Sequence, residues 1–178
     1  VLTMEMFGWD GQPALDEYLS APAQDKLRFL EQARWKQNWG GAFDNYEPLV
    51  NYSREHRLAL RAMNPPKTLI RQVVKVGLDE ARTGQDWAEW GMNREDIVDD
   101  QAYRARILDQ LKRCHGGGTD EDYVRMYEAS MVRDEGMAKT VADALMTARR
   151  DPQNRTVILS YTGGGHIQFN LPVPKRVA

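Results

Sequence analysis

Glu5, Asn64 and His166 can each take part in chemistry, and each lies at or just beyond the end of a short apolar segment. A carboxylate and an imidazole can bind a metal ion or exchange protons, and an amide can orient a carbonyl group or a water molecule. We therefore treat Glu5 and His166 as a candidate acid/base pair or as ligands of a divalent metal. Asn64 is a candidate ligand-binding residue, although an asparagine before proline is also typical of a turn.

A run of three glycines directly precedes His166. Glycine allows the backbone to approach a ligand closely, and its N–H groups can bind an anion. Glycine also loses more conformational freedom on folding than any other residue, so three in succession are unfavourable unless a structure or a ligand needs them. We interpret Gly163, Gly164 and Gly165 as a ligand-binding loop.

Asp134 is a further candidate ligand-binding residue, because its spacing places it among apolar side chains. It lies seven residues after Tyr127 and three before Met137, which puts all three on one face of a helix. An acid on such a face must be paired or must line a cavity. We expect Arg133 or Arg71 to be its partner, and a purely structural hydrogen-bond network remains the alternative.

Three segments are predicted to be the strands that position these residues: 1–7, 57–63 and 156–161. Each is short, apolar or alternating, and each is followed by glycine or proline. Helical sequence rather than a hairpin turn separates them, which indicates parallel strands joined by crossovers. The expected fold is therefore α/β, with a small central parallel sheet of three or four strands flanked by many α-helices.

Parallel strands bring their carboxyl ends to the same edge of a sheet, where ligands of such folds bind. We therefore expect the acid, the amide and the imidazole to converge at one edge.

The periodicity of apolar residues predicts four longer helices, over 24–39, 66–82, 100–115 and 119–150. Thr119 and Asp122 are spaced as a capping box at the start of the last one. The segment 171–174 contains two prolines and is predicted to be extended.

The composition excludes several classes of protein. The chain has 24 Lys and Arg against 26 Asp and Glu, a net charge of −2, which argues against a nucleic-acid-binding protein. No run of 18 apolar residues is present, as a membrane-spanning helix would require. Cys114 is the single cysteine, so it can form neither an internal disulfide nor a thiolate cage for a metal.

Five segments, in this order, resemble the ChaN-like haem-binding uptake family of the Tiki/TraB and erythromycin-esterase-like superfamily. They are Glu5–Phe7, Tyr46–Leu49, Ala62–Pro66, Ala129–Ala142 and Gly163–His166. The resemblance extends along nearly the whole chain. It implies an α/β fold with a central parallel sheet and a haem-binding protein of the bacterial envelope that takes part in iron uptake.

The resemblance further implies a homodimer with haem bound between its subunits, and a tyrosine as the iron ligand. A phenolate suits ferric haem because it is a hard oxygen donor. Tyr46 matches the family's segment and is our candidate, with a core tyrosine as the alternative. The family is often lipid-anchored, and we expect any contact with a membrane to be made through an anchor that this sequence does not include.

We expect the chain to be a single α/β domain, 1–178, that lacks its first strand. The sequence opens directly in an apolar segment at Val1, and the first of the superfamily's two Gly-x-x-His elements would lie upstream of it. A metal site that needs both histidines would be incomplete in this chain. A metal-dependent hydrolase using Glu5 and His166 is therefore the second hypothesis. The third is a helix-rich module that dimerises, in which the residues at the strand ends are a structural remnant.

Overall fold

The structure, a computed structural model, describes residues 1–23, 25–151, 153 and 155–178. The chain forms two units, which are described separately below. Unit 1 comprises Val1–Pro66 and Thr140–Gly163, and unit 2 comprises Lys67–Lys139 and Gly164–Ala178.

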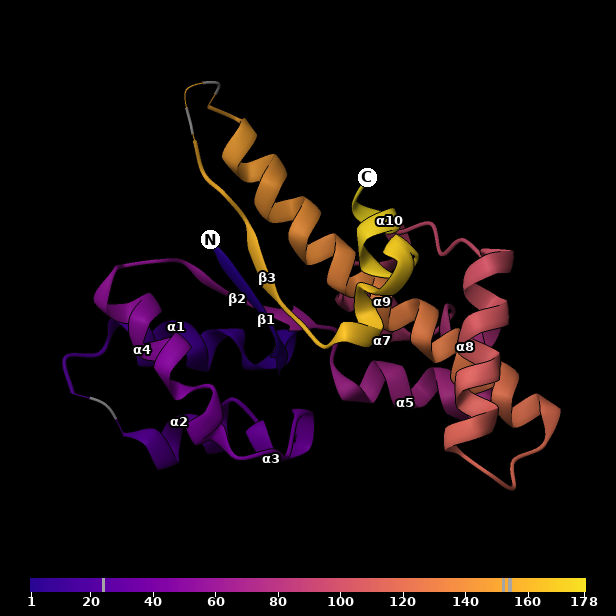
Figure 1. The fold of residues 1–178 in the computed structure, drawn as a ribbon. Coiled ribbons are helices and arrows are strands. Elements are labelled where there is room, and N and C mark those ends of the chain that lie inside the picture. Colours follow the sequence, from indigo (N-terminus) through magenta and orange to yellow (C-terminus); the bar gives the residue numbers. More distant parts are fainter. Residues whose placement is uncertain (24, 152, 154) are drawn as a thin grey trace. The chain divides into compact units, whose positions relative to one another are not determined.

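Unit 1 contains a three-stranded parallel sheet. Its strands are β1 (Leu2–Gly8), β2 (Leu60–Asn64) and β3 (Leu159–Tyr161), in the order β2-β1-β3 (Figure 1). Leu2 pairs with Leu60 on one side and with Leu159 on the other. The α/β class and the parallel direction of the strands are thus confirmed.

The central strand accounts for much of the core of unit 1. All seven residues of β1 are buried, whereas all three residues of β3 are exposed. A middle strand is covered on both edges and can be apolar throughout, while an edge strand keeps one edge open.

Several α-helices of the N-terminal part of unit 1 lie beside the sheet (Figure 1). They are α1 (Gln12–Ser20), α2 (Lys26–Gln32), α3 (Trp35–Asn38) and α4 (Glu47–Glu55). The single helix predicted for 24–39 is wrong, because Arg34 adopts a left-handed conformation (φ 51°) that separates α2 from α3; Gln24 lies outside the described residues. Asp25 caps α2 by accepting a hydrogen bond from the backbone N–H of Arg28 at 3.0 Å.

Aromatic side chains from β1, α2, α3 and the 3₁₀ turn Phe43–Asn45 pack together. The ring of Phe7 lies 5.3 Å from Trp35 and 6.0 Å from Phe29, and the ring of Phe43 meets Trp35 edge to face at 5.1 Å. All four residues are buried. The turn at Arg34 therefore places Trp35 in the core, which offsets the unfavourable backbone conformation.

Unit 2 is helical. It contains α5 (Lys67–Val76), α6 (Leu78–Ala81), α7 (Gln85–Glu89) and α8 (Gln101–Cys114). The single helix predicted for 66–82 is divided at Gly77, whose φ of 84° is readily adopted only by glycine. Glu128 accepts a hydrogen bond from the backbone N–H of Leu78 at 2.9 Å and so satisfies the first turn of α6.

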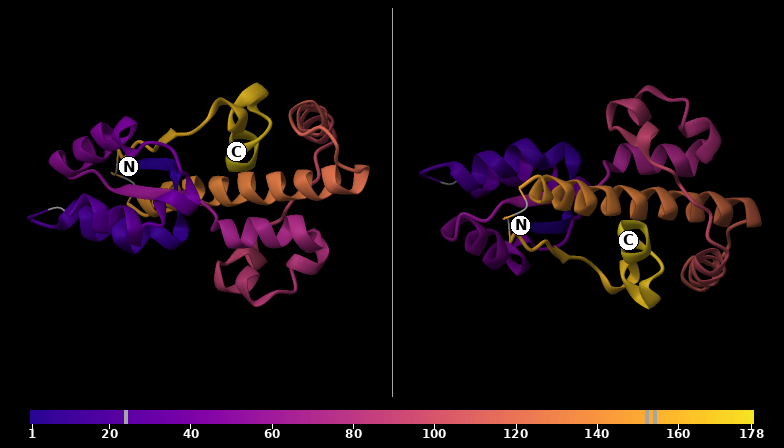
Figure 2. Two further views of the ribbon diagram at one scale, coloured as in Figure 1. Left: turned by 90° about the horizontal axis from the view of Figure 1, so that it is seen from below. Right: turned by 90° about the horizontal axis from the view of Figure 1, so that it is seen from above.

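The longest helix, α9 (Asp120–Arg149), remains helical through Gly136 (Figure 2). Its residues up to Lys139 belong to unit 2, and those from Thr140 onward belong to unit 1. The predicted capping box is confirmed: Asp122 accepts hydrogen bonds from the backbone and hydroxyl of Thr119, each at 2.8 Å.

The C-terminal part of unit 2 consists of short turns. They are the 3₁₀ turns Gly164–His166 and Gln168–Asn170, followed by α10 (Val173–Val177). The extended conformation predicted for 171–174 is wrong for its second half, because Pro174 lies in the first turn of α10, where a helix tolerates proline.

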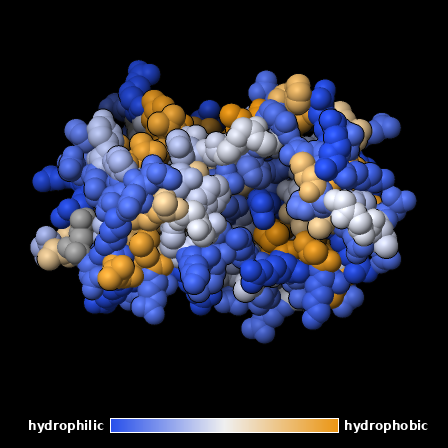
Figure 3. Space-filling model, turned by 60° about the horizontal axis from the view of Figure 1, so that its bottom comes forward, coloured by the Kyte–Doolittle hydropathy of each residue, from blue (hydrophilic) through white to orange (hydrophobic). Residues whose placement is uncertain are grey.

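Within the described ranges, no helix is both long enough and apolar enough to cross a membrane. Figure 3 shows one face of the molecule, where hydrophobic residues form separate groups among hydrophilic ones.

Candidate functional site

The predicted site residues fall into three groups of contacts. Glu5, Asn64 and Gly163 are in contact within unit 1, and Asp134 and His166 are in contact within unit 2. Tyr46 belongs to an aromatic group in unit 1. The convergence of Glu5, Asn64 and His166 at one edge stays a prediction, because the third lies in a different unit from the first two.

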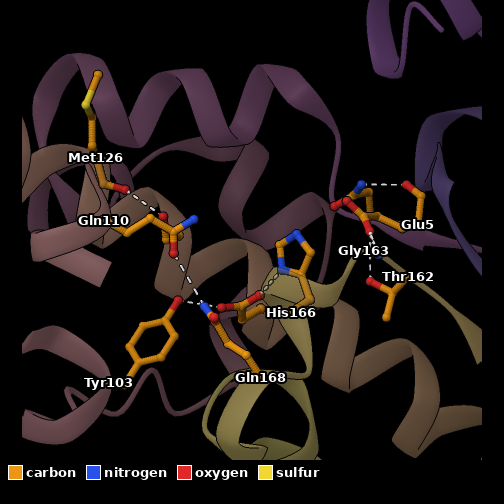
Figure 4. A network of polar contacts seen from close by, with 11 residues as sticks. Glu5, Tyr103, Gln110, Met126, Thr162, Gly163, His166 and Gln168 are labelled. Atoms are coloured by element: carbon orange, nitrogen blue, oxygen red, sulfur yellow. Dashed lines mark hydrogen bonds and ion pairs between the residues drawn. The ribbon is translucent and has the colours of Figure 1, made fainter. Parts of the chain in front are cut away.

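The carboxylate of Glu5 joins the ends of β1 and β3. It is 6% exposed, and its Oε2 atom accepts hydrogen bonds from the Thr162 hydroxyl at 2.8 Å and from the backbone N–H of Gly163 at 2.6 Å (Figure 4). A Cβ atom on residue 163 would lie 3.3 Å from the same oxygen, so a glycine fits this close approach. Glu5 therefore holds the start of the glycine run against the sheet.

Asn64 holds the end of β2 in the same way. Its Nδ2 atom donates to the backbone carbonyl of Glu5 at 2.5 Å. Its Oδ1 atom is buried and accepts no hydrogen bond within the described part of the chain. Asn64 thus has one structural contact and one buried acceptor that a donor from a ligand or water can satisfy.

Asp134 carries the strongest polar network of unit 2. It is 2% exposed on α9, and its Oδ1 atom lies 2.5 Å from Nδ1 of His166 (Figure 4). Its Oδ2 atom accepts a hydrogen bond from the hydroxyl of Tyr103 on α8. The expectation that Arg133 or Arg71 pairs with Asp134 is therefore wrong, since a tyrosine and a histidine satisfy it.

The surroundings keep Tyr103 protonated. Burial raises the pKa of the Tyr103 hydroxyl, and the negative charge of Asp134 raises it further. The hydroxyl therefore keeps its proton at neutral pH and can donate it to Asp134. Asp100 fixes the helix position of Tyr103, because its side chain caps α8 by accepting from the Tyr103 backbone N–H at 2.9 Å.

A carboxylate bonded to Nδ1 of a histidine is a common way to orient the ring. When Nδ1 carries the proton, Nε2 is the atom left to act as a base or as a ligand. The side chain of His166 is 20% exposed, so the ring is not fully enclosed.

The other glycines of the loop have open space around them. A Cβ atom on Gly164 or Gly165 would meet no atom of the described residues within 4 Å. Packing among these residues therefore does not explain glycine at these two positions, and their role as ligand-binding residues stays a prediction.

Tyr46 lies among three other aromatic residues. Its hydroxyl accepts a hydrogen bond from the indole N–H of Trp39 at 3.1 Å, and its ring lies 5.6 Å from Trp35 and 6.3 Å from Tyr161. The ring is partly buried, whereas Tyr161 on β3 is 43% exposed. In this aromatic group, Trp35 is buried, whereas Trp39 and Tyr46 are half-buried and Tyr161 is exposed. The last three can present ring surface and two phenol oxygens to a ligand.

Two contributors to these networks were not identified from the sequence. Tyr103 lies in the helix predicted for 100–115, but nothing in the sequence shows that it meets an acid on another helix. Thr162 follows β3 directly, and its position beside the glycine run is the one signal that indicates its role. Among the described residues, no group of three or more His, Cys, Asp or Glu side chains is placed to hold a metal ion.

Comparison with known proteins gives two findings. A family model described as "Haem-binding uptake, Tiki superfamily, ChaN" matches residues 1–177. The fold is similar to a solved structure described as "Cofacial heme binding to ChaN of Campylobacter jejuni", with a TM-score of 0.69 and 13% sequence identity. The match covers 99% of this chain and 61% of that one, so this chain spans about three fifths of that protein's length. No curated protein matches the chain.

Proposed function

We propose that this chain, which belongs to the ChaN family of haem-binding uptake proteins in the Tiki superfamily, binds haem. The observation that carries the proposal is the family match over residues 1–177, which includes all the site residues described above. The solved structure of similar fold supports the proposal, because its description names cofacial haem binding.

The aromatic group in unit 1 is compatible with haem. A porphyrin needs a flat apolar surface and a ligand for its iron, and a tyrosine oxygen is one of the known ligands of ferric haem. Four of the seven tyrosines, Tyr18, Tyr103, Tyr123 and Tyr127, are buried and cannot reach a bound porphyrin without rearrangement. The other three are Tyr46, Tyr52 and Tyr161.

We propose Tyr46 as the iron ligand. Trp39 donates a hydrogen bond to its oxygen at 3.1 Å, which fixes the position of that oxygen. Tyr161 lies edge to face with Tyr46 at 6.3 Å and is exposed enough to contact a porphyrin face. Tyr52 on α4 lies instead against the ring of His56 at 4.1 Å, which makes it a matched control six residues after Tyr46, the N-cap of the same helix.

A homodimer is proposed on the same basis. Two haems that face each other are most simply supplied by two copies of one chain, one haem from each, which produces a two-fold symmetric interface. Location in the bacterial envelope and attachment through a lipid anchor are proposed from the family only.

A metal-dependent hydrolase is not favoured. The Glu5 carboxylate is engaged by Thr162 and Gly163, and the described residues contain no group able to hold a metal ion.

Titration with ferric haem, followed at the Soret band, tests the proposal. We expect saturation at one haem per chain. Tyr46→Phe is expected to abolish the tyrosinate spectrum, whereas Tyr52→Phe is expected to bind as the wild type does. Trp39→Phe removes the hydrogen bond to the phenolate and is expected to weaken binding without abolishing it. Absence of saturable binding by the wild type would contradict the proposed function.

A further inference from the structure

The turn Gln168–Asn170 in unit 2 exposes an aromatic ring on an unfavourable backbone. Phe169 and Asn170 have φ values of 57° and 56°, in the left-handed region, and the side chain of Phe169 is 65% exposed. Asparagine tolerates this region, but for a bulky residue it is unusual and costs free energy. Burial does not offset that cost here, because the ring faces solvent. Unexplained strain of this kind is a reason to look for a function.

Arg106 on α8 is stacked on this ring. Its guanidinium carbon lies 3.8 Å from the centroid of the Phe169 ring. Within the described part of the chain, Arg106 has no carboxylate partner. A guanidinium stacked on an aromatic ring keeps its N–H groups at the edge, where they can bind a carboxylate with two parallel hydrogen bonds.

The pair borders a hollow of about 360 Å³, which we call the Arg106–Phe169 hollow. Its lining also includes Gln110, Arg113, Cys114 and Gln168. The amide of Gln168 donates to Gln110 at 3.4 Å, which ties the turn to α8 (Figure 4). The volume is within the range of small-molecule sites.

The charge of the hollow is positive. Arg113 forms an ion pair with Asp109, which lies four residues earlier on α8 and also lines the hollow. These two charges balance each other, so the charge of Arg106 remains for an incoming anion.

We propose that the Arg106–Phe169 hollow binds a planar aromatic carboxylate. Its ring stacks on the aromatic–guanidinium pair, and its carboxylate is bound by the N–H groups of Arg106. The two amides, Gln110 and Gln168, supply further polar contacts at the rim. The proposal requires no iron ligand, so it is independent of haem binding through Tyr46.

The probe is 1-pyrenecarboxylate, whose fluorescence reports binding. We expect saturable binding of one molecule per chain, and much weaker binding of the neutral 1-pyrenemethanol. Cys114 provides a second readout, because it is the single cysteine, is exposed and lines the hollow. Its alkylation by iodoacetamide, followed by mass spectrometry, is expected to slow when the probe is bound.

Three variants test the residues. Arg106→Gln is expected to weaken binding about tenfold or more, since a hydrogen bond between charged groups is lost. Phe169→Leu is expected to weaken it less, because apolar contact remains. The matched control is Arg28→Gln in unit 1, which removes an exposed arginine paired with Glu17 and is expected to bind as the wild type does.

Circular dichroism establishes that each variant is folded. Tyr46→Phe is expected to bind the probe normally, which separates a failure here from a failure of the proposed function. The proposal is overturned by any of three results: no saturable binding, equal affinity in Arg106→Gln, or unchanged alkylation of Cys114 at saturating probe.

Discussion

Removal of the Asp134 carboxylate is the sharpest test of the network in unit 2. In Asp134→Ala, the Tyr103 hydroxyl and Nδ1 of His166 both lose their partner. A buried polar group left without a partner costs about 1–3 kcal/mol. Tyr103 is 1% exposed and bears this cost in full, while water can partly satisfy His166 because its side chain is 20% exposed. We therefore expect a loss of about 2–4 kcal/mol.

Asp134→Asn is the matched variant. The asparagine has nearly the same shape, and its oxygen can still accept from Tyr103 while its amide nitrogen donates to Nδ1 of His166. The histidine must then carry its proton on Nε2. We expect this substitution to cost about 1 kcal/mol and to change the tautomer of His166.

Hydrogen exchange of the amides in α8 and α9 measures these losses within unit 2. A loss of about 2–4 kcal/mol accelerates exchange roughly 30- to 900-fold. The nitrogen chemical shifts of His166 report its tautomer. Unchanged exchange in Asp134→Ala, or the same tautomer in the wild type and Asp134→Asn, would refute the reasoning.

Three further predictions concern the rest of the molecule. Phe7→Ala removes a fully buried ring that packs against Phe29 and Trp35. We expect it to lower the free energy of unfolding in urea by about 3–5 kcal/mol. A loss below about 1 kcal/mol would contradict the packing described for unit 1. Gly77→Ala forces a side chain into an extended backbone conformation with positive φ (φ 84°, ψ 164°) that essentially only glycine adopts, and is expected to cost about 1–3 kcal/mol, read as a lower melting temperature. Burial raises the pKa of Glu135 although its partner Arg176 opposes the shift, so the folded state binds this proton more tightly than the unfolded state. The stability that this group contributes is thus complete below its ordinary pKa and is lost as the pH rises through the raised value. We therefore expect the free energy of unfolding of the wild type, relative to that of Glu135→Gln, to fall over that pH range. A difference that rises with pH would contradict the raised pKa.

The sheet was predictable because its signals are local. Each strand is a short apolar run ended by glycine or proline, and helical sequence between the runs leaves parallel pairing as the simplest connection. Two observed strands begin three residues later than predicted: β2 starts at Leu60 rather than at 57, and β3 starts at Leu159 rather than at 156.

The helix breaks were harder to predict. Gly77 was present as a signal, but a glycine within a helical pattern is often tolerated. Arg34 gave no signal, because its left-handed conformation is imposed by the burial of Trp35, which depends on contacts distant in the sequence. The C-terminal helix α10 was not predicted, because two closely spaced prolines are typical of extended chain and the sequence does not show that Pro174 lies in a first helical turn, where proline is tolerated.

The candidate site was partly predictable. Asp134 was identified as a buried acid from its spacing, but its partners were not, since the pairing of α8, α9 and the glycine-rich turn is tertiary. Glu5, Asn64 and Gly163 were identified from their positions at strand ends, and the contacts among them follow from parallel pairing. Their structural role, holding the strand ends together, could not be distinguished from a catalytic one in the sequence.

The electron paramagnetic resonance spectrum of the chain with one equivalent of ferric haem tests the central claim most directly. The account predicts the high-spin signal of a haem with an oxygen ligand in the wild type and in Tyr52→Phe, and its loss in Tyr46→Phe. The spectrum of free haem in the wild type would contradict haem binding, and an unchanged signal in Tyr46→Phe would contradict Tyr46 as the ligand.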